Sequence, residues 1–476
     1  MLAPIHVLVR SDADPYSSYL AEMLRVEGLN WFAEHSGLPT ESPQLIIAAA
    51  QDLDAATAER LSAYVRAGGS LLACRPSAAL LAALDLPPAP PLPEEWSNRY
   101  VLLEPTSPIV HNLPWVPTGV QFFGRPIALP VNPNEPDPIA VARIAPFPTQ
   151  SSRFAAVTAH TLGRGRVILF AFDPAESIVR QQQGRPAQAS TGPLPDFDAD
   201  TTYRPNDLFF GQLDFALRDT PQADLQRTLF LRCVEWLTES RPLPRLWRFP
   251  SSAPAAALFD GDSDSMDLQD FRNVIEVCDR YGAPFGTFLM RESIKILPPE
   301  EEARARARGH TFGPHPWAGP QPSVGELRDA LNANCDEFSA AYGYRPRIHR
   351  GHWLVWPGYV DHARSLQTAG IELDANFTAG WGFKGGYVNG TGLPARFIDE
   401  DGRLLDVYEQ STISTDDGWL MSKGGLPAMT LAEVISRSCS LIDAAIDKWH
   451  TVYHPYFHPR PIKGGGAYPY PTRPRL

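Results

Sequence analysis

The stretch Ala255-Ala256-Ala257-Leu258-Phe259-Asp260-Gly261-Asp262-Ser263-Asp264 organises the rest of this chain. Its apolar half predicts a buried strand, and its second half places an acid at every second position, at Asp260, Asp262 and Asp264. The carboxyl ends of strands are where α/β folds carry their chemistry. Three carboxylates this close repel one another, which favours a bound cation or proton. The alternative is an Asp- and Ser-rich turn that only caps the following helix.

Length and composition limit the number of domains and the classes of partner that this protein can have. A chain of 476 residues is long enough for more than one domain. The net charge of −12 and the lack of a basic cluster argue against nucleic acid or a membrane surface as partner. The five cysteines form no CxxC pair, which favours buried free thiols. The sequence shows neither a long apolar run nor a signal-peptide pattern, so we expect a cytoplasmic protein.

Residues 1–240 predict a first domain in which strands and helices alternate. Apolar runs at 5–9, 44–49 and 70–74 predict buried strands of a parallel sheet covered by helices. With a hairpin predicted at 163–172, this half resembles the flavodoxin-like domains related to class I glutamine amidotransferases and the trimerisation domains of some β-galactosidases. The resemblance implies a flavodoxin-like fold and the option of a homo-oligomer formed through this domain.

A glutamine amidotransferase needs a cysteine nucleophile on a sharp strand-to-helix turn. Cys74 ends a predicted strand, but Arg75-Pro76 follows it in place of a glycine pair. We therefore expect the first domain to be non-catalytic, with a role in assembly or in gating the substrate.

The segment 241–252, rich in proline and arginine, predicts a linker to a second domain at 253–476. Repeated strand-helix units there predict a barrel of parallel strands, in which residues at the strand ends share one face. The polar residues at the predicted strand ends are Asp260, Asp262, His315, Arg350, His352, Asp374 and His454. Such a set supplies what metal-assisted hydrolysis of an acyl group needs.

The same positions resemble the motifs of polysaccharide deacetylases, the NodB-homology proteins of carbohydrate esterase family 4. The first family motif, Thr-Phe-Asp-Asp-Gly, corresponds to Leu258-Phe259-Asp260-Gly261-Asp262. The resemblance implies a distorted β/α barrel, with Asp260 as general base and Asp262 as a metal ligand. In the second motif, His315 matches the first metal histidine, and Gly319 stands where the second is expected.

The later motifs complete the implied site. Arg350-Gly351-His352-Trp353 corresponds to the third motif, and its arginine pairs with the base in the family. Asp374 is the candidate for the acid of the fourth motif. His454, after an apolar strand, is the candidate for the histidine of the fifth motif and would be the general acid.

A tetrahedral cation site needs three protein ligands and a water. His352 lies two residues after Arg350, so both side chains should point to the same side of their strand. We predict His352 as the third ligand, with nitrogen and oxygen donors separated by roughly 3–4 Å. Asp264 and His310 are weaker candidates, and a core position for His352 or His310 is the alternative.

Several aromatic and histidine residues have two interpretations. His458 lies in a proline-rich segment and is expected to face solvent. The tryptophans near the predicted site either stack on a sugar ring or fill the barrel mouth, with core packing as the default: Trp317, Trp353, Trp356 and Trp381.

The expected function is a metal-dependent hydrolase of non-peptide carbon–nitrogen bonds, with deacetylation of an N-acetylated carbohydrate as the model reaction. The expected cofactor is a divalent metal, preferably zinc. A close variant acts on a small amide substrate in the cytoplasm. The alternative class is a non-catalytic carbohydrate-binding or scaffold protein on a degenerate barrel, which the missing histidine at Gly319 favours.

Overall fold

The computed structural model describes residues 3–9, 14–111, 113, 119–129, 139–190, 202–209, 211–264, 266–379, 385–420 and 427–459. The chain divides into two compact units. The first unit comprises Met1–Gln181, Gln222–Ser252 and Ile398–Leu404. The second unit comprises Gln182–Pro221, Ala253–Phe397 and Leu405–Leu476.

These units differ from the predicted boundaries in three places, one of which is Ile398–Leu404, a segment of the predicted second domain that groups with the first unit. Gln182–Pro221 groups with the second unit, where Tyr203 N donates to the Pro320 carbonyl at 3.0 Å. The predicted linker at 241–252 groups with the first unit, where Leu246 N donates to the Gly28 carbonyl at 3.0 Å. Proline content marked 241–252 as a connection but carried no information about which core this segment joins.

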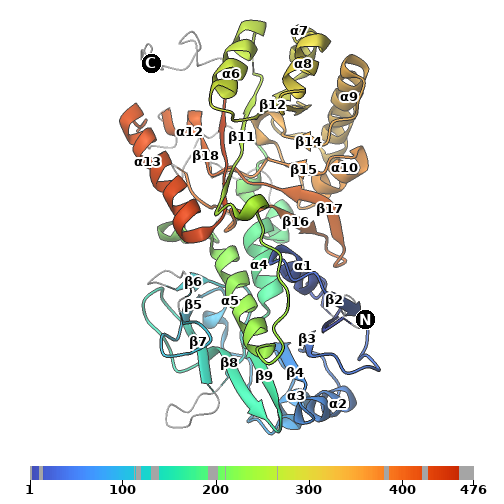
Figure 1. The fold of residues 1–476 in the computed structure, drawn as a ribbon, viewed down its shortest axis with the longest axis vertical. Helices are drawn as coiled ribbons and strands as arrows, with labels where there is room; N and C mark the ends of the chain where they lie inside the picture. Colours follow the sequence, from blue (N-terminus) through green and yellow to red (C-terminus); the bar gives the residue numbers. More distant parts are fainter. Residues whose placement is uncertain are drawn as a thin grey trace. The chain divides into compact units, whose positions relative to one another are not determined.

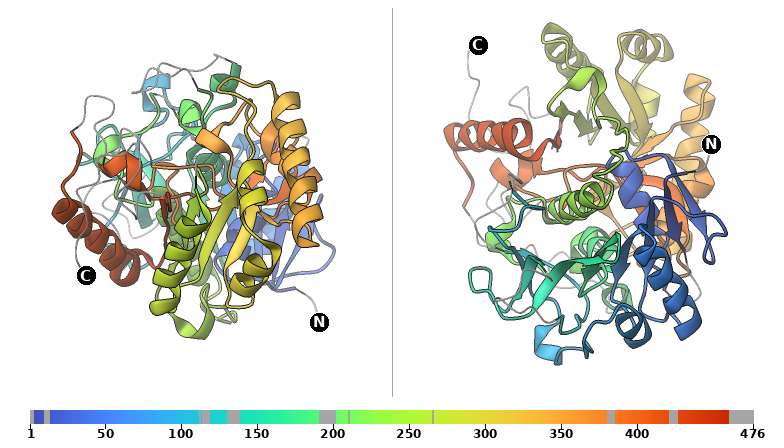
Figure 2. Two further views of the ribbon diagram at one scale, coloured as in Figure 1. Left: turned by 90° about the horizontal axis from the view of Figure 1, so that it is seen from above. Right: turned by 60° about the horizontal axis from the view of Figure 1, so that its bottom comes forward.

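The first unit is built on one sheet with strand order β2-β1-β3-β4-β9-β8-β7-β5-β6. Neighbours from β2 to β9 are parallel, and neighbours from β9 to β6 are antiparallel. The right-hand view of Figure 2 shows the blue parallel strands and the teal antiparallel ones. The strands are β1 (Ile5–Leu8), β2 (Phe32–His35), β3 (Leu45–Ala49), β4 (Ser70–Cys74), β5 (Tyr100–Leu103), β6 (Val120–Gln121), β7 (Ile139–Ala145), β8 (Ala155–Leu162) and β9 (Gly165–Phe170).

Local sequence signals explain the helices of this unit. Asp54 accepts from Thr57 N at 2.7 Å and so caps α2, which ends before Gly68 with its positive φ of 109°. Helices α2 and α5 pack against β4 and β9. The helices are α1 (Tyr19–Val26), α2 (Ala55–Arg66), α3 (Ala78–Ala83), α4 (Pro174–Gln183) and α5 (Gln222–Leu237).

Most strands of the second unit form two sheets. Their orders are β13-β12-β11-β20-β18 and β14-β15-β17-β16, and a separate parallel pair joins β10 to β19. All neighbouring strands of the first of these sheets are parallel. In the second sheet, β14 is parallel to β15 and β15 is parallel to β17. The strands are β10 (Ala256–Ala257), β11 (Phe259–Asp262), β12 (Phe285–Leu289), β13 (Thr311–Pro314), β14 (Ile348–His349), β15 (Leu373–Asp374), β16 (Ala395–Ile398), β17 (Leu404–Glu409), β18 (Ser414–Thr415), β19 (Val452–Tyr453) and β20 (Pro455–Phe457).

Helices alternate with these strands, as the repeated sequence pattern predicts. Helix α9 packs between α8 and α10, as the three ribbons of Figure 1 show. The capping box of α6 is made by Asp267 and Asp270, so neither Asp262 nor Asp264 serves as its cap. The helices are α6 (Leu268–Arg280), α7 (Arg291–Ile296), α8 (Pro299–Arg306), α9 (Val324–Tyr342), α10 (Asp361–Ala369), α12 (Asp416–Leu420) and α13 (Leu431–Ala444).

The two sheets of the second unit meet at their edge strands, where β13 lies beside β14. Gly313 allows the close approach, because a Cβ there would lie 2.2 Å from the Ile348 carbonyl oxygen. Beyond the strand ends, His352 N donates to the Pro316 carbonyl at 3.0 Å. This junction holds the segments that carry His315 and His352 side by side.

Candidate active site

Arg350 lies at the centre of the site, just after β14. It is fully buried, and its Nη1 and Nη2 donate to the two oxygens of Asp260 at 2.9 and 3.0 Å. Nη1 also donates to Asp262 Oδ1 at 3.2 Å. The rings of Phe288 and Tyr456 lie 4.6 and 4.5 Å from the guanidinium carbon, so the cation is held between aromatic faces.

This arginine keeps its partner carboxylate ionised inside the protein. Burial alone raises the pKa of Asp260, but the charge of Arg350 and the neighbouring His454 outweigh it, and the pKa lies below its ordinary value. The pairing of Arg350 with Asp260 that the family resemblance implies is present in the structure, and it is bidentate.

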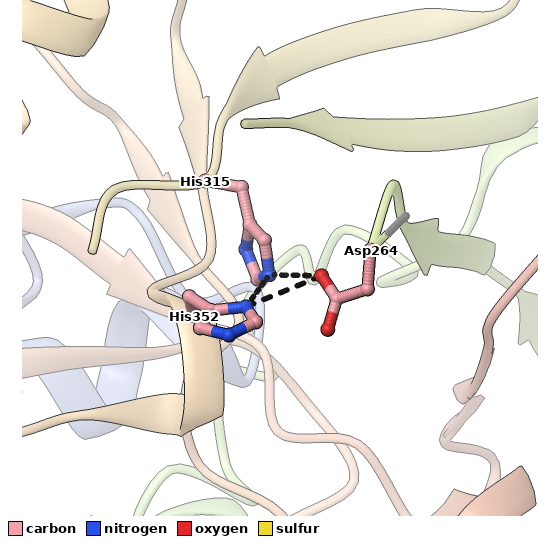
Figure 3. A group of neighbouring side chains, drawn as sticks. All are labelled: Asp264, His315 and His352. Atoms are coloured by element: carbon pink, nitrogen blue, oxygen red, sulfur yellow. Dashed lines mark hydrogen bonds and ion pairs between the residues drawn. The ribbon is translucent and has the colours of Figure 1, made fainter. Parts of the chain in front are cut away.

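Asp264, His315 and His352 bring three donor atoms together, and we call them the three-donor cluster (Figure 3). Asp264 Oδ1 lies 3.1 Å from His315 Nε2 and 3.2 Å from His352 Nδ1. The two ring nitrogens lie 3.3 Å apart. Ligands about 2.0–2.1 Å from a tetrahedral zinc ion lie about 3.3 Å from one another, so the cluster fits such a cation in donor type and spacing.

Hydrogen bonds around the cluster fix the direction of its donor atoms. His315 Nδ1 donates to the Arg350 carbonyl at 2.7 Å, which leaves Nε2 directed at the other two donors. Burial opposes ionisation of Asp264, but its hydrogen bonds to His315 and His352 outweigh that effect and hold its pKa well below the ordinary value. The cluster therefore presents a carboxylate and two imidazoles at one point.

Asp264, a weaker candidate in the sequence, lies nearer to His315 Nε2 than Asp262, the predicted ligand, at 3.1 Å against 3.7 Å. Asp260 and Asp262 lie on one face of β11 and both reach Arg350. Asp264 follows the strand end, where the chain turns, and its side chain reaches the two histidines instead. The predicted approach of His352 to His315 is present, at 3.3 Å.

Asp262 lies between the arginine and the three-donor cluster. Its Oδ1 accepts from Arg350, and its Oδ2 is 3.7 Å from His315 Nε2. Asp260, in contrast, accepts three hydrogen bonds from Arg350 and His454. Asp262 is thus the carboxylate nearer to the three-donor cluster, and Asp260, predicted to be the general base, is the one that pairs with both Arg350 and His454.

His454 lies behind Asp260. Its Nε2 is 2.8 Å from Asp260 Oδ2, and its Nδ1 is 3.1 Å from the Gln410 carbonyl. Both ring nitrogens therefore face acceptor oxygens inside the protein. This arrangement orients Asp260 and does not point the imidazole toward the three-donor cluster.

His458 differs from its prediction, because it is buried and not solvent-facing. Its Nδ1 and its backbone N both bond to Asp416, each at 2.9 Å, and its Nε2 lies 3.9 Å from Asp264 Oδ2. Burial lowers its pKa, but the Asp416 carboxylate outweighs this and raises the pKa to about 10. The sequence signal for this pair was an acid directly after β18, followed by a histidine directly after β20.

Asp374, predicted to belong to the catalytic set, does not join it. Its Oδ1 bonds to His349 Nδ1 at 2.7 Å, and it is fully buried. Register explains the difference, because Asp374 pairs with His349 in the sheet and not with Arg350, so it lies on the opposite face of the strands. Asp374 is a structural residue of the core.

The structure also shows the surroundings of His310 and of three of the four tryptophans named in the sequence analysis. His310 accepts from Phe285 N at 3.0 Å and contacts Asp279, so it has the structural role that was its alternative. Trp356 is buried in a core cluster, whereas Trp317 and Trp353 are exposed. Trp381 lies outside the described residues.

No protein-family model matches the chain, and no curated protein matches it. Among solved structures, a Bordetella bronchiseptica protein described as a polysaccharide deacetylase of O-antigen biosynthesis is 16% identical, with 46% of this chain and 78% of that chain covered and a TM-score of 0.30. Agd3, a carbohydrate deacetylase, is 10% identical over 96% and 79%, with a TM-score of 0.36. A β-galactosidase from Rahnella sp. R3 is 14% identical over 37% and 29%, with a TM-score of 0.27.

Likenesses this weak do not define an activity. The chain has a mixed α/β fold with several parallel sheets. The comparisons do not support the glutamine amidotransferase-like interpretation of residues 1–240. Burial raises the pKa of the Cys74 thiol well above its ordinary value, which also disfavours a nucleophilic role. Within the described residues, no helix is long and apolar enough to cross a membrane.

Proposed function

We propose that this protein is a metal-dependent hydrolase that removes the acetyl group from an N-acetylated carbohydrate. The observation that carries the proposal is the three-donor cluster, with donors 3.1–3.3 Å apart, beside the Arg350-held Asp262. Two imidazoles and one carboxylate are a ligand set typical of catalytic zinc sites. A bound divalent cation would polarise the amide carbonyl and lower the pKa of a water.

The protein side chains supply the general base, the general acid and the residues that position them. Asp262, next to His315, is the general base that accepts the proton of the attacking water. Arg350, itself paired with Asp260, donates to that carboxylate and fixes its position. His458, positively charged through its contact with Asp416, donates a proton to the departing amine. His454 positions Asp260 from behind.

The non-catalytic scaffold remains the second candidate, since Gly319 supplies no ligand. His352 answers that objection, because its Nδ1 completes the set that His315 and Asp264 begin. The buried Arg350 network is a further argument for an enzyme. A scaffold has no need to hold charged groups fully buried beside a cluster of cation ligands, where unpaired charge is costly.

Chelation and one substitution test the proposal together. Zinc-loaded protein should release acetate from N-acetylglucosamine oligomers, lose this activity when treated with a chelator and regain it with zinc. Asp262→Asn should lower kcat by about 10²–10⁴-fold while the melting temperature and zinc content stay unchanged. A zinc-loaded protein with no hydrolysis of N-acetylated sugars or aryl acetates would support the scaffold instead.

A further inference from the structure

Asn376 lies two residues beyond the end of β15 and is fully buried, although its side chain is polar. Its amide is satisfied at both ends, because Oδ1 accepts from Gly351 N at 2.6 Å and Nδ2 donates to the Val355 carbonyl at 3.1 Å. These two partners enclose the turn His352–Leu354. One side chain therefore closes the turn that presents a ligand of the three-donor cluster.

This amide clamp continues the pairing of β14 with β15 past the point where both strands end. Ala375 N donates to the His349 carbonyl at 3.0 Å, and Arg350 Nε donates to the Ala375 carbonyl at 2.9 Å. Gly351 N comes next along the chain, and the Asn376 side chain accepts from it where a backbone carbonyl would in a longer strand. A Cβ at residue 351 would lie 3.3 Å from Asn376 Nδ2, so glycine leaves room for the contact.

The backbone of the enclosed turn is strained. Trp353 and Leu354 both have positive φ, 57° and 58°, a conformation that residues other than glycine rarely adopt. Such strain persists only where the surrounding structure enforces it. The same turn places the His352 ring, whose Nδ1 lies 3.3 Å from His315 Nε2. A hold on both ends of the turn is therefore also a hold on the position of this imidazole.

We propose that Asn376 is a positioning residue for His352, because it holds the turn closed so that the imidazole meets the other two donors of the cluster. This inference deepens the proposed function and rests on the cation site proposed there. Groups that orient a ligand from behind typically contribute about 10–100-fold to metal affinity. A ligand that is already in place loses less conformational freedom on binding. Loss of Asn376 should therefore weaken cation binding although every donor atom is kept.

The test measures zinc affinity and backbone exchange on the full-length protein. Asn376→Ala should weaken zinc binding by about 10–100-fold in competition with a chromogenic chelator. In metal-free protein, hydrogen exchange followed by mass spectrometry should be faster at residues 351–355, because both ends of the turn are released. Asn389→Ala, at another buried asparagine of the second unit, is the matched control and should equal the wild type in both measurements.

A double-mutant cycle separates positioning from a general loss of stability. In a His352→Ala background, Asn376→Ala should change zinc affinity by less than about twofold, because the ligand on which it acts is gone. A loss as large as in the wild-type background would show that Asn376 acts elsewhere and would overturn the proposal.

Gly351→Val reaches the same contact from the other side and keeps the test falsifiable if Asn376→Ala fails to fold. Its side chain would press on the Asn376 amide, so zinc binding should weaken and exchange at 351–355 should rise. Unchanged exchange, or faster exchange with unchanged zinc affinity, would overturn the proposal. A wild type that binds no zinc would refute the proposed function, and faster exchange in Asn376→Ala would then still support the clamp on the turn.

Discussion

His458 and His454 have different partners, and those partners decide which imidazole can protonate a leaving amine. His458 is charged through Asp416 and faces Asp264, whereas both nitrogens of His454 face Asp260 and a carbonyl. We predict that His458→Gln lowers kcat on an N-acetylated sugar by about 10²-fold or more. His454→Gln, which can still donate to Asp260, should lower it by less than about tenfold.

Steady-state kinetics on the two variants, with zinc content as the control, shows whether His458 or His454 is the general acid. A larger loss in His454→Gln than in His458→Gln would return the role of general acid to His454, as the family resemblance implies.

The alternation of side chains along a strand explains which residues could be predicted. Asp260 and Asp262 are two apart, and both indeed reach Arg350. Asp264 lies beyond the strand, where alternation no longer applies, so its contact with the histidines could not be derived. His458 was missed because its burial depends on Asp416, a partner 42 residues away.

At the scale of elements, β15 and β17 carry a second buried polar pair. Asp374 and Glu409 are partners in the parallel register and share a hydrogen bond. Burial raises the pKa of Glu409 well above its ordinary 4.5, and the Asp374 charge raises it further. Phe377 N donates to Glu409 Oε1 at 3.0 Å, so the other oxygen is left to carry the proton.

This pair predicts how stability depends on pH. The folded state holds the Glu409 proton at a pH where the unfolded state has lost it, so stability falls as the pH rises from 4.5 toward the folded pKa. Over that window the slope approaches about 1.4 kcal/mol per pH unit. Glu409→Gln keeps the hydrogen bonds without the proton, and its free energy of unfolding should not show this decline.

Urea unfolding of the wild type and Glu409→Gln at several pH values measures the difference. Glu400→Gln, at an exposed position, is the control and should follow the wild-type curve. Parallel curves for wild type and Glu409→Gln would show that Glu409 is ionised in the folded protein.

Register also limited what could be predicted about these strands. The existence and order of the strand-helix units followed from their apolar periods. The pairing of Asp374 with His349 required the register, and a shift of one residue moves a side chain to the opposite face. Asp374 was therefore assigned to the wrong face.

At the scale of the whole molecule, buried Glu27 ties the segment 241–252 to the first unit. Its Oε2 accepts from Arg245 Nη2 at 2.9 Å and from Arg248 Nη2 at 2.8 Å, and its backbone carbonyl accepts from Arg245 Nε. Domain boundaries could not be placed from composition, because these partners lie more than 200 residues apart in the sequence.

We predict that Glu27→Gln exposes this segment to trypsin. Cleavage after Arg245 and Arg248 should accelerate several-fold, because the lost ion pairs stabilise the bound segment by about 1–3 kcal/mol. Mass spectrometry of the fragments identifies the sites. Glu235→Gln removes a more exposed carboxylate that also lies near Arg245, and it should digest at the wild-type rate. Equal rates in both variants would show that Glu27 does not hold the segment.

The central claim is that Asp264, His315 and His352 bind a divalent cation. Its most direct test is the zinc content of purified protein after dialysis against limiting zinc, measured by elemental mass spectrometry. The wild type and Asp262→Asn should retain close to one equivalent per chain, while Asp264→Ala and His352→Ala should retain almost none. Zinc that survives loss of Asp264 and His352, or a wild type that binds none, would contradict the account.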